Sequence, residues 1–153
     1  NRLSMFLLVE NKRVDADAVE NTATINNSDT TTPEVDLEPT SFFKTLTDDM
    51  RLKSLMLMHY HGELCVCELM EGLDEASQPK VSRNLAVLRK SQIILDRKHG
   101  QWVFYRINPA LPLWAKSAIA QTTEHNVAMI NQQIQRLDQM KNRPNKDNFC
   151  NVK

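Results

Sequence analysis

The sequence predicts a mainly α-helical fold with one small β-hairpin, and three observations indicate it. Between residues 41 and 90, apolar residues recur at helical spacing in segments separated by glycines and polar turn residues. At 93–107, two apolar and aromatic runs flank His99-Gly100, where glycine permits a positive φ. From about residue 113 to 140 the helical periodicity returns. Helices, a hairpin and then a further helix is the element order of a winged helix-turn-helix domain.

The 153-residue chain is expected to hold one domain with a tail at each end. Residues 1–40 carry eight acidic and three basic side chains and few large apolar ones, which predicts an acidic, disordered arm. The domain is expected to span 41–142, followed by a flexible tail at 143–153. From residue 41 onward there are 16 basic and 11 acidic side chains, which favours a polyanionic partner. Because the chain begins with Asn1 instead of Met, the true start residue is left open.

The cysteines and the apolar runs bear on the cellular compartment. Three cysteines, two of them separated by one residue, are not typical of a disulfide framework, so we expect a reducing, cytoplasmic setting. No apolar run approaches the roughly 18 residues of a transmembrane helix, so no membrane partner is expected. No Cys-x-x-Cys, cofactor motif or active-site loop is found in the sequence, which argues against an enzyme.

Three short helices are predicted in the first half of the domain. The first has an apolar face made by Phe42, Phe43 and Leu46. The second covers about 49–59, because Asp48 is a good N-cap and apolar residues follow at spacings of three and four. The third is expected to begin close to Cys65, to run to about Glu71 and to be closed by Gly72.

The fourth helix has the properties of a helix that reads DNA. Ser77 is a good N-cap, and Pro79 is tolerated in a first turn. On its exposed face, Lys80 and Arg83 are suited to phosphates or guanine edges, and Gln78 or Asn84 to adenine. The candidate DNA-binding residues of this helix are Ser77, Gln78, Lys80, Ser82, Arg83 and Asn84. For a basic helix on its own, the alternative interpretation is that its polar face is simply exposed to solvent. The hairpin that follows this helix favours DNA binding instead.

The hairpin and the last helix complete the predicted domain. Arg97, Lys98 and His99 crowd the hairpin tip, which is expected to lie on the DNA backbone or in the minor groove. The last helix carries apolar residues at spacings of three, four and three, a seam suited to packing against another helix. Its members are Val127, Ile130, Ile134 and Leu137.

Residues 42–114 resemble the ArsR/SmtB family of metal-responsive repressors, particularly those of arsenical-resistance operons. The resemblance rests mainly on the segments at 63–69, 77–85 and 95–106. It implies a homodimer that binds double-stranded operator DNA and dissociates when arsenite or antimonite binds Cys65 and Cys67. The resemblance also implies that the protein needs no cofactor in order to fold. In that family the first and last helices form the dimer, which implies an interface of Phe42, Phe43, Leu46, Val127, Ile130, Ile134 and Leu137.

The sequence departs from the family at two positions. A third cysteine commonly follows three residues after the second, and here that position is Met70, whose thioether is a poorer ligand for arsenic(III). The family often has histidine where Asn84 stands, so the operator preference is expected to differ.

The spacing of the two cysteines raises a geometric question. On an ideal helix Cys65 and Cys67 would point about 200° apart and would not bind one ion together. Either Cys65 lies in a non-helical cap, or binding unwinds the first turn. For the third ligand we consider Cys150, a small cellular thiol, or no further sulfur if the inducer is an organoarsenical.

Three other functions are alternatives to the arsenical sensor. A cadmium, lead or zinc sensor of the same family is the main alternative, because soft thiolates also bind those ions. A redox switch at Cys65 or Cys67 would release DNA on oxidation. A thiol enzyme is the least favoured, for want of an active-site motif.

Overall fold

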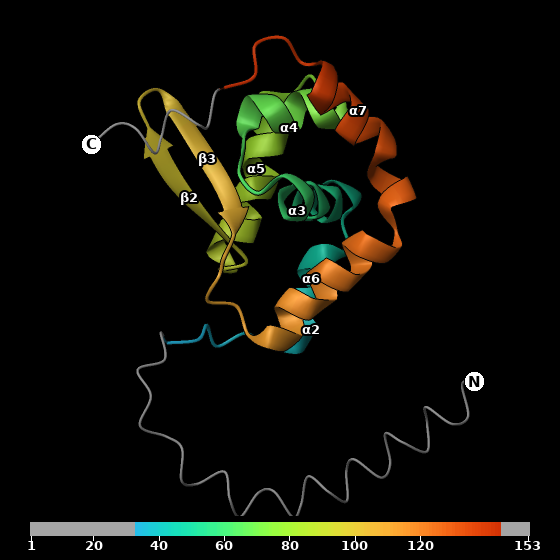
Figure 1. Cartoon of the computed structure of the whole chain (residues 1–153). Helices are drawn as coiled ribbons and strands as arrows, with labels where there is room; N and C mark the ends of the chain where they lie inside the picture. Colours follow the sequence, from blue (N-terminus) through green and yellow to red (C-terminus); the bar gives the residue numbers. More distant parts are fainter. Residues whose placement is uncertain (1–32, 145–153) are drawn as a thin grey trace, which may run out of the picture. The chain divides into compact units, whose positions relative to one another are not determined.

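The computed structural model describes residues 33–144. Residues 1–32 of the predicted arm (1–40) and residues 145–153 of the predicted tail (143–153), including Cys150, lie outside the described residues. The helices are α2 (Pro39–Leu46), α3 (Asp49–His61), α4 (Val66–Leu73), α5 (Gln78–Lys90), α6 (Leu113–His125) and α7 (Asn131–Gln139). The strands are β1 (Leu64–Cys65), β2 (Ile94–His99) and β3 (Trp102–Ile107). The predicted mainly α fold with a β-hairpin is confirmed (Figure 1).

Helix α3 lies at the centre of the described domain, with the hairpin on one side and α6 on the other (Figure 1). Four consecutive side chains, Leu55–Met58, are buried, so α3 is covered on more than one face. The sequence predicted one apolar face for this helix. The difference arises because α3 packs simultaneously against α2, α5, α6 and β3.

Strand β1 was not expected from the sequence. Within the described residues the sheet has the order β1-β3-β2, with both pairings antiparallel. Cys65 of β1 lies opposite Phe104 of β3. The hairpin turns at Gly100, whose φ of +61° is the left-handed conformation that glycine adopts readily. The short strand therefore joins the first cysteine directly to the hairpin.

Gly72 does not end α4, contrary to the prediction. The helix continues to Leu73 and ends at Asp74, which adopts a left-handed conformation with φ of 54°. A Cβ at position 72 would lie 3.2 Å from Cγ of Leu137. Gly72 is thus the point where α7 approaches α4 closely, and Figure 1 shows these two helices side by side.

The apolar seam of the last helix packs within the chain itself. The expected helix at 113–140 is interrupted at Asn126 by a 3-10 turn at Val127–Ile130, after which α7 begins. Ile130 and Leu137 are fully buried in the core, and Ile134 packs against the same core. Phe42 of α2 is also fully buried. As a correction to the expected dimer interface, Phe42, Ile130 and Leu137 therefore have no surface left to offer a partner.

Candidate functional site

Cys65 and Cys67 bring their sulfur atoms together at the start of α4. Cys65 is the N-cap residue, with an extended backbone (φ −90°, ψ 170°), and Cys67 lies in the first turn. Their Sγ atoms are 2.8 Å apart, longer than the roughly 2.05 Å of a disulfide, and both are free thiols. Of the two geometric alternatives, the structure has the non-helical cap. The two sulfurs converge because Cys65 lies outside the helix.

A buried carboxylate stabilises this cap. Glu68 is fully buried, and its Oε1 accepts a hydrogen bond from the backbone N–H of Cys65 at 3.0 Å. Its Oε2 accepts from Nε of Arg143 at 2.5 Å. Because Arg143 follows α7, this ion pair holds the last described residues of the chain close to the thiols. Sequence reasoning did not predict this capping role of Glu68, although a glutamate three residues after an N-cap is the capping-box spacing.

Burial favours the neutral form of the Cys65 thiol. Desolvation, followed by the hydrogen bond with Cys67, raises the pKa of Cys65 to about 12. Cys65 is therefore protonated at neutral pH. A ligand that binds it as a thiolate must displace this proton.

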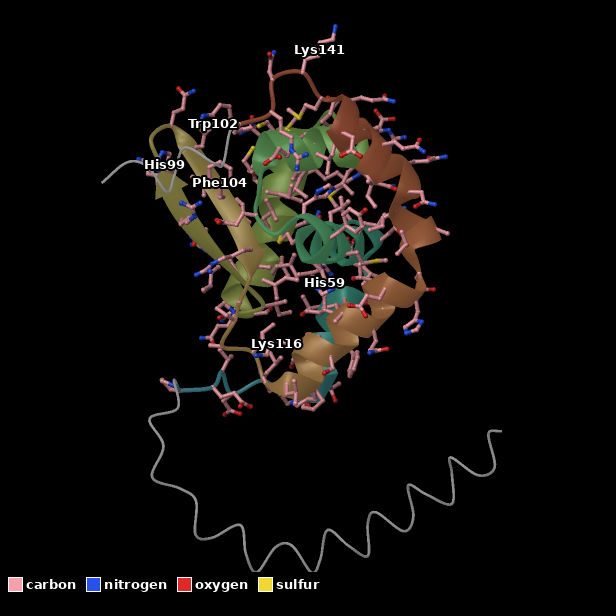
Figure 2. The ribbon with its side chains drawn as sticks, viewed as in Figure 1. His59, His99, Trp102, Phe104, Lys116 and Lys141 are labelled. Atoms are coloured by element: carbon pink, nitrogen blue, oxygen red, sulfur yellow. The ribbon has the colours of Figure 1, made fainter. Side chains whose placement is uncertain are left out.

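A pocket of about 260 Å³ opens beside the two thiols. Its apolar lining comes from Val66 and Met70 of α4 and from Trp102 and Val103 of β3. Gln78 and Gln101 add polar groups from the first residue of α5 and from the hairpin turn. The pocket thus lies where the thiol segment, the predicted reading helix and the hairpin meet, and Figure 2 shows Trp102 and Phe104 on that hairpin.

Among residues 33–144, no cluster of three or more His, Cys, Asp or Glu side chains is placed to hold a metal ion. His59 lies 3.4 Å from Glu124, between their Nε2 and Oε1 atoms, on the surface between α3 and α6. The described residues therefore provide a two-thiol site. The predicted third ligand, Cys150, lies outside them.

The exposed face of α5 carries the predicted cationic side chains. Ser77 acts as the N-cap, because its Oγ accepts from the backbone N–H of Lys80 at 3.3 Å. Gln78, Lys80 and Arg83 are exposed, and Ser82 is half-buried. Nζ of Lys80 lies 3.0 Å from Oε2 of Glu75, an exposed ion pair that costs little to break.

The side chain of Asn84 forms hydrogen bonds within the protein. Its Oδ1 accepts from Nη1 of Arg51 at 3.0 Å, and its Nδ2 donates to the carbonyl of Lys80 at 3.0 Å. Nε of Arg51 donates in turn to the carbonyl of Thr45 at 2.7 Å. Asn84 therefore joins α5 to α3, and both the oxygen and the nitrogen of its side-chain amide form hydrogen bonds within the protein.

The cationic residues predicted for the hairpin tip differ in their surroundings. Arg97 forms a two-point ion pair with Glu63, with N···O distances of 2.5 and 3.0 Å, and its guanidinium lies 5.5 Å from the ring centroid of Phe104. Lys98 is exposed. His99 is half-buried and lies near the turn of the hairpin (Figure 2). Since Glu63 directly precedes β1, Arg97 forms a second connection between the hairpin and the thiol segment.

An exposed apolar surface covers α2 and the start of α6. Phe43, Leu113 and Trp114 are 52%, 74% and 39% exposed. The rings of Phe43 and Trp114 lie 6.2 Å apart, centroid to centroid. Leu46 and Val127, also predicted for the dimer interface, are half-buried. Sequence reasoning identified Phe43 but missed Leu113 and Trp114, whose exposure depends on how α6 packs.

No helix within residues 33–144 is long and apolar enough to cross a membrane. This finding concerns the described helices alone.

Comparison with known proteins identifies similar chains. Residues 48–94 match the family described as "Bacterial regulatory protein, arsR family". The chain is 44% identical over 114 residues to the arsenic resistance transcriptional regulator ArsR2 of Pseudomonas putida, covering 74% of this chain and 98% of that one. It is 52% identical over 83 residues to the arsenical resistance operon repressor of Escherichia coli, covering 54% and 70%. Among solved structures, the transcriptional repressor BigR of Xylella fastidiosa has a TM-score of 0.51 at 28% identity, covering 59% and 84%.

Proposed function

The chain belongs to the arsR family of bacterial regulatory proteins, and from this premise we propose that it is a transcriptional repressor of an arsenical-resistance operon. Arsenite or antimonite binds Cys65 and Cys67 and releases the protein from its operator. The observation that carries the proposal is the convergence of the two thiols, with their sulfur atoms 2.8 Å apart beside a pocket. Thiolates are soft ligands that suit such thiophilic ions.

The proposed DNA-binding surface combines the exposed face of α5 with the hairpin tip. Gln78, Lys80 and Arg83 meet the major groove, while Lys98 and His99 meet the backbone or the minor groove. Ser77 and Ser82 flank the reading face. Phosphate contacts supply most of the affinity and make it strongly dependent on salt. Arg97 and Asn84 support these elements through Glu63 and Arg51.

Two protomers are proposed to associate through α2 and α6. Phe43, Leu113 and Trp114 supply an exposed apolar surface there. A dimer places two copies of α5 on two half-sites of the operator, which is how helix-turn-helix dimers read DNA. This surface replaces the buried residues of the expected interface, and Phe43 is common to both.

The link from the thiols to DNA runs through the hairpin. Cys65 pairs with Phe104 in the sheet, and Glu63 is held by Arg97. An ion that repositions Cys65 therefore displaces β3 and the hairpin tip. A coupling free energy of about 1–3 kcal/mol, five- to 150-fold in affinity, is typical of allosteric proteins and is enough for release.

Cys150 is the proposed third sulfur for arsenite. Arg143 holds the chain at Glu68, whose other oxygen bonds the N–H of Cys65. Six residues separate Arg143 from Cys150. Because a fully extended chain spans at most about 3.3–3.6 Å per residue, the seven steps from Arg143 to Cys150 give a maximum reach of roughly 23–25 Å.

The test is release of the purified protein from its operator under reducing conditions. Arsenite and antimonite should release the wild type, whereas the double variant Cys65→Ser with Cys67→Ser should bind DNA normally and stay bound. Cys150→Ser removes one thiol outside the pair, and its response to arsenite should be weakened but not lost. Release of the wild type by cadmium or zinc alone would instead favour the divalent-metal sensor, and release by peroxide alone the redox switch. A normal arsenite response in the double variant would refute the proposed site.

A further inference from the structure

The pocket beside the two thiols contains no third thiol among its lining residues, and its remaining sulfur is the thioether of Met70. Where the third cysteine of a three-sulfur site would stand there is Met70, and it lines this pocket together with Val66, Trp102 and Val103. A thioether has no proton to lose and forms no As–S bond by exchange with a hydroxyl group. The described site therefore combines two exchangeable sulfurs with an apolar space.

We propose that the preferred inducers are trivalent monoorganoarsenicals, whose organic group occupies the pocket lined by Val66, Met70 and Trp102. The proposal rests on the sensing function proposed above and assigns the ligand class of that same site.

The valence of arsenic(III) supports this assignment. Arsenite, As(OH)₃, must exchange three hydroxyl groups for three sulfurs, so besides the two converged thiols it needs a third sulfur from outside residues 33–144, proposed above as Cys150. A monoorganoarsenical, R–As(OH)₂, already has one As–C bond and needs two sulfurs. Each thiol proton leaves with one hydroxyl, so two As–O bonds break, two As–S bonds form and two water molecules are released. Arsenic stays in the +3 state, and no oxidant or reductant is consumed.

The size and lining of the pocket suit the organic group. A cavity of about 150 Å³ lined by apolar side chains holds a benzene molecule, and this pocket measures about 260 Å³. The indole of Trp102 provides an aromatic surface for an aryl group. An aryl substituent should therefore gain more than a methyl group from burial.

The position of the pocket also gives the organic group an effect on DNA binding. Gln78, the first residue of α5, and Gln101 of the hairpin turn line the same pocket. A group held there contacts both proposed DNA-binding elements. Inorganic arsenite bound to the same thiols would leave this space empty.

The experiment measures operator release by three ligands: arsenite, methylarsonous acid and phenylarsonous acid. In fluorescence anisotropy, we expect half-release by the phenyl compound at a concentration at least about tenfold below that for arsenite, with the methyl compound between them. Cys150→Ser should weaken the response to arsenite and leave the response to the phenyl compound unaltered, because two sulfurs suffice for the latter.

Met70→Cys is the decisive variant, because it adds a third thiol one helical turn beyond Cys67. Half-release by arsenite should shift to a lower concentration, and the preference for the phenyl compound should be lost. Met70→Leu is the matched control, since it keeps the pocket apolar and should keep the preference. Native operator affinity of both variants establishes that they fold.

The outcomes separate this inference from the proposed function. Equal release by all three ligands, or stronger release by arsenite, would overturn the organoarsenical preference and leave the sensing function standing. No release by any arsenical would overturn both. A phenyl response that persists in the Cys65→Ser, Cys67→Ser double variant would also overturn both, because the thiols would not be the site.

Discussion

Replacing Arg143 with alanine should destabilise the domain and loosen the chain that leads to the tail. Glu68 is fully buried, and the side chain of Arg143 is 29% exposed. A hydrogen bond to a charged group contributes about 1.5–3 kcal/mol, and removing one partner of a fully buried ion pair costs about 3–5 kcal/mol. Because Arg143 is partly solvated and Glu68 keeps its bond to the N–H of Cys65, we expect a loss of about 2 kcal/mol.

Thermal denaturation followed by circular dichroism in reducing buffer measures this loss. For a domain of about this size, roughly 2 kcal/mol corresponds to a decrease in Tm of about 10 °C. Arg89→Ala is the matched control. Its Nη1 lies 3.0 Å from Oδ2 of Asp96, the two side chains are 59% and 35% exposed, and such surface pairs contribute about 0–1 kcal/mol.

A double-mutant cycle isolates the ion pair. Glu68→Gln combined with Arg143→Ala removes the buried charge along with its partner, and the amide oxygen still accepts from the N–H of Cys65. We therefore expect the double variant to be more stable than Arg143→Ala alone. If Arg143→Ala and Arg89→Ala have the same Tm, the ion pair of Arg143 with Glu68 does not anchor the chain beside the thiols, and the argument for the reach of Cys150 fails.

The remaining predictions concern DNA binding and thiol reactivity. Arg83→Ala should reduce operator affinity by about tenfold and lower its salt dependence. Arg106→Ala, near the end of β3 away from the hairpin tip, removes the same charge and should have little effect. Equal losses in both variants would indicate non-specific electrostatics. Iodoacetamide should alkylate Cys67 before Cys65 at pH 8 in the Cys150→Ser variant. Burial raises the pKa of Cys65 to about 12, and the thiolate is the reactive form, so its labelling should accelerate as the pH rises toward that value. Mass spectrometry of the peptides gives the order, and earlier labelling of Cys65 would contradict the assigned burial.

Local signals predicted helix α5 well. Ser77 caps α5 as expected, and Val81, Leu85 and Leu88 are buried. These features depend on neighbours within one or two turns, which the sequence displays directly. The hairpin was predictable for the same reason, since Gly100 and the flanking apolar runs define it locally.

The sequence leaves two conformations open for Cys65, and the reason is different. A two-residue strand has no alternation to recognise, and β1 exists because residues about forty positions later pair with it. Its pairing gives Cys65 an extended backbone and turns its sulfur toward Cys67. The partners of Asn84 were equally hidden, since Arg51 lies 33 residues away in sequence.

Periodicity reports that a helix face is buried but does not identify what covers it. The sequence predicts that Ile130 and Leu137 face a second protomer, whereas both are buried in the core of the domain itself, where Leu137 packs against Gly72 of α4. The sequence by itself determined most of the helices, the hairpin, the cationic face of α5 and the presence of two neighbouring thiols, because each of these depends on residues close together in the chain. Only the tertiary structure decided that the thiols converge, that an apolar pocket lies beside them and that Arg143 is fastened to Glu68. Those features come from contacts between segments far apart in the chain, whose geometry follows from packing of the whole domain.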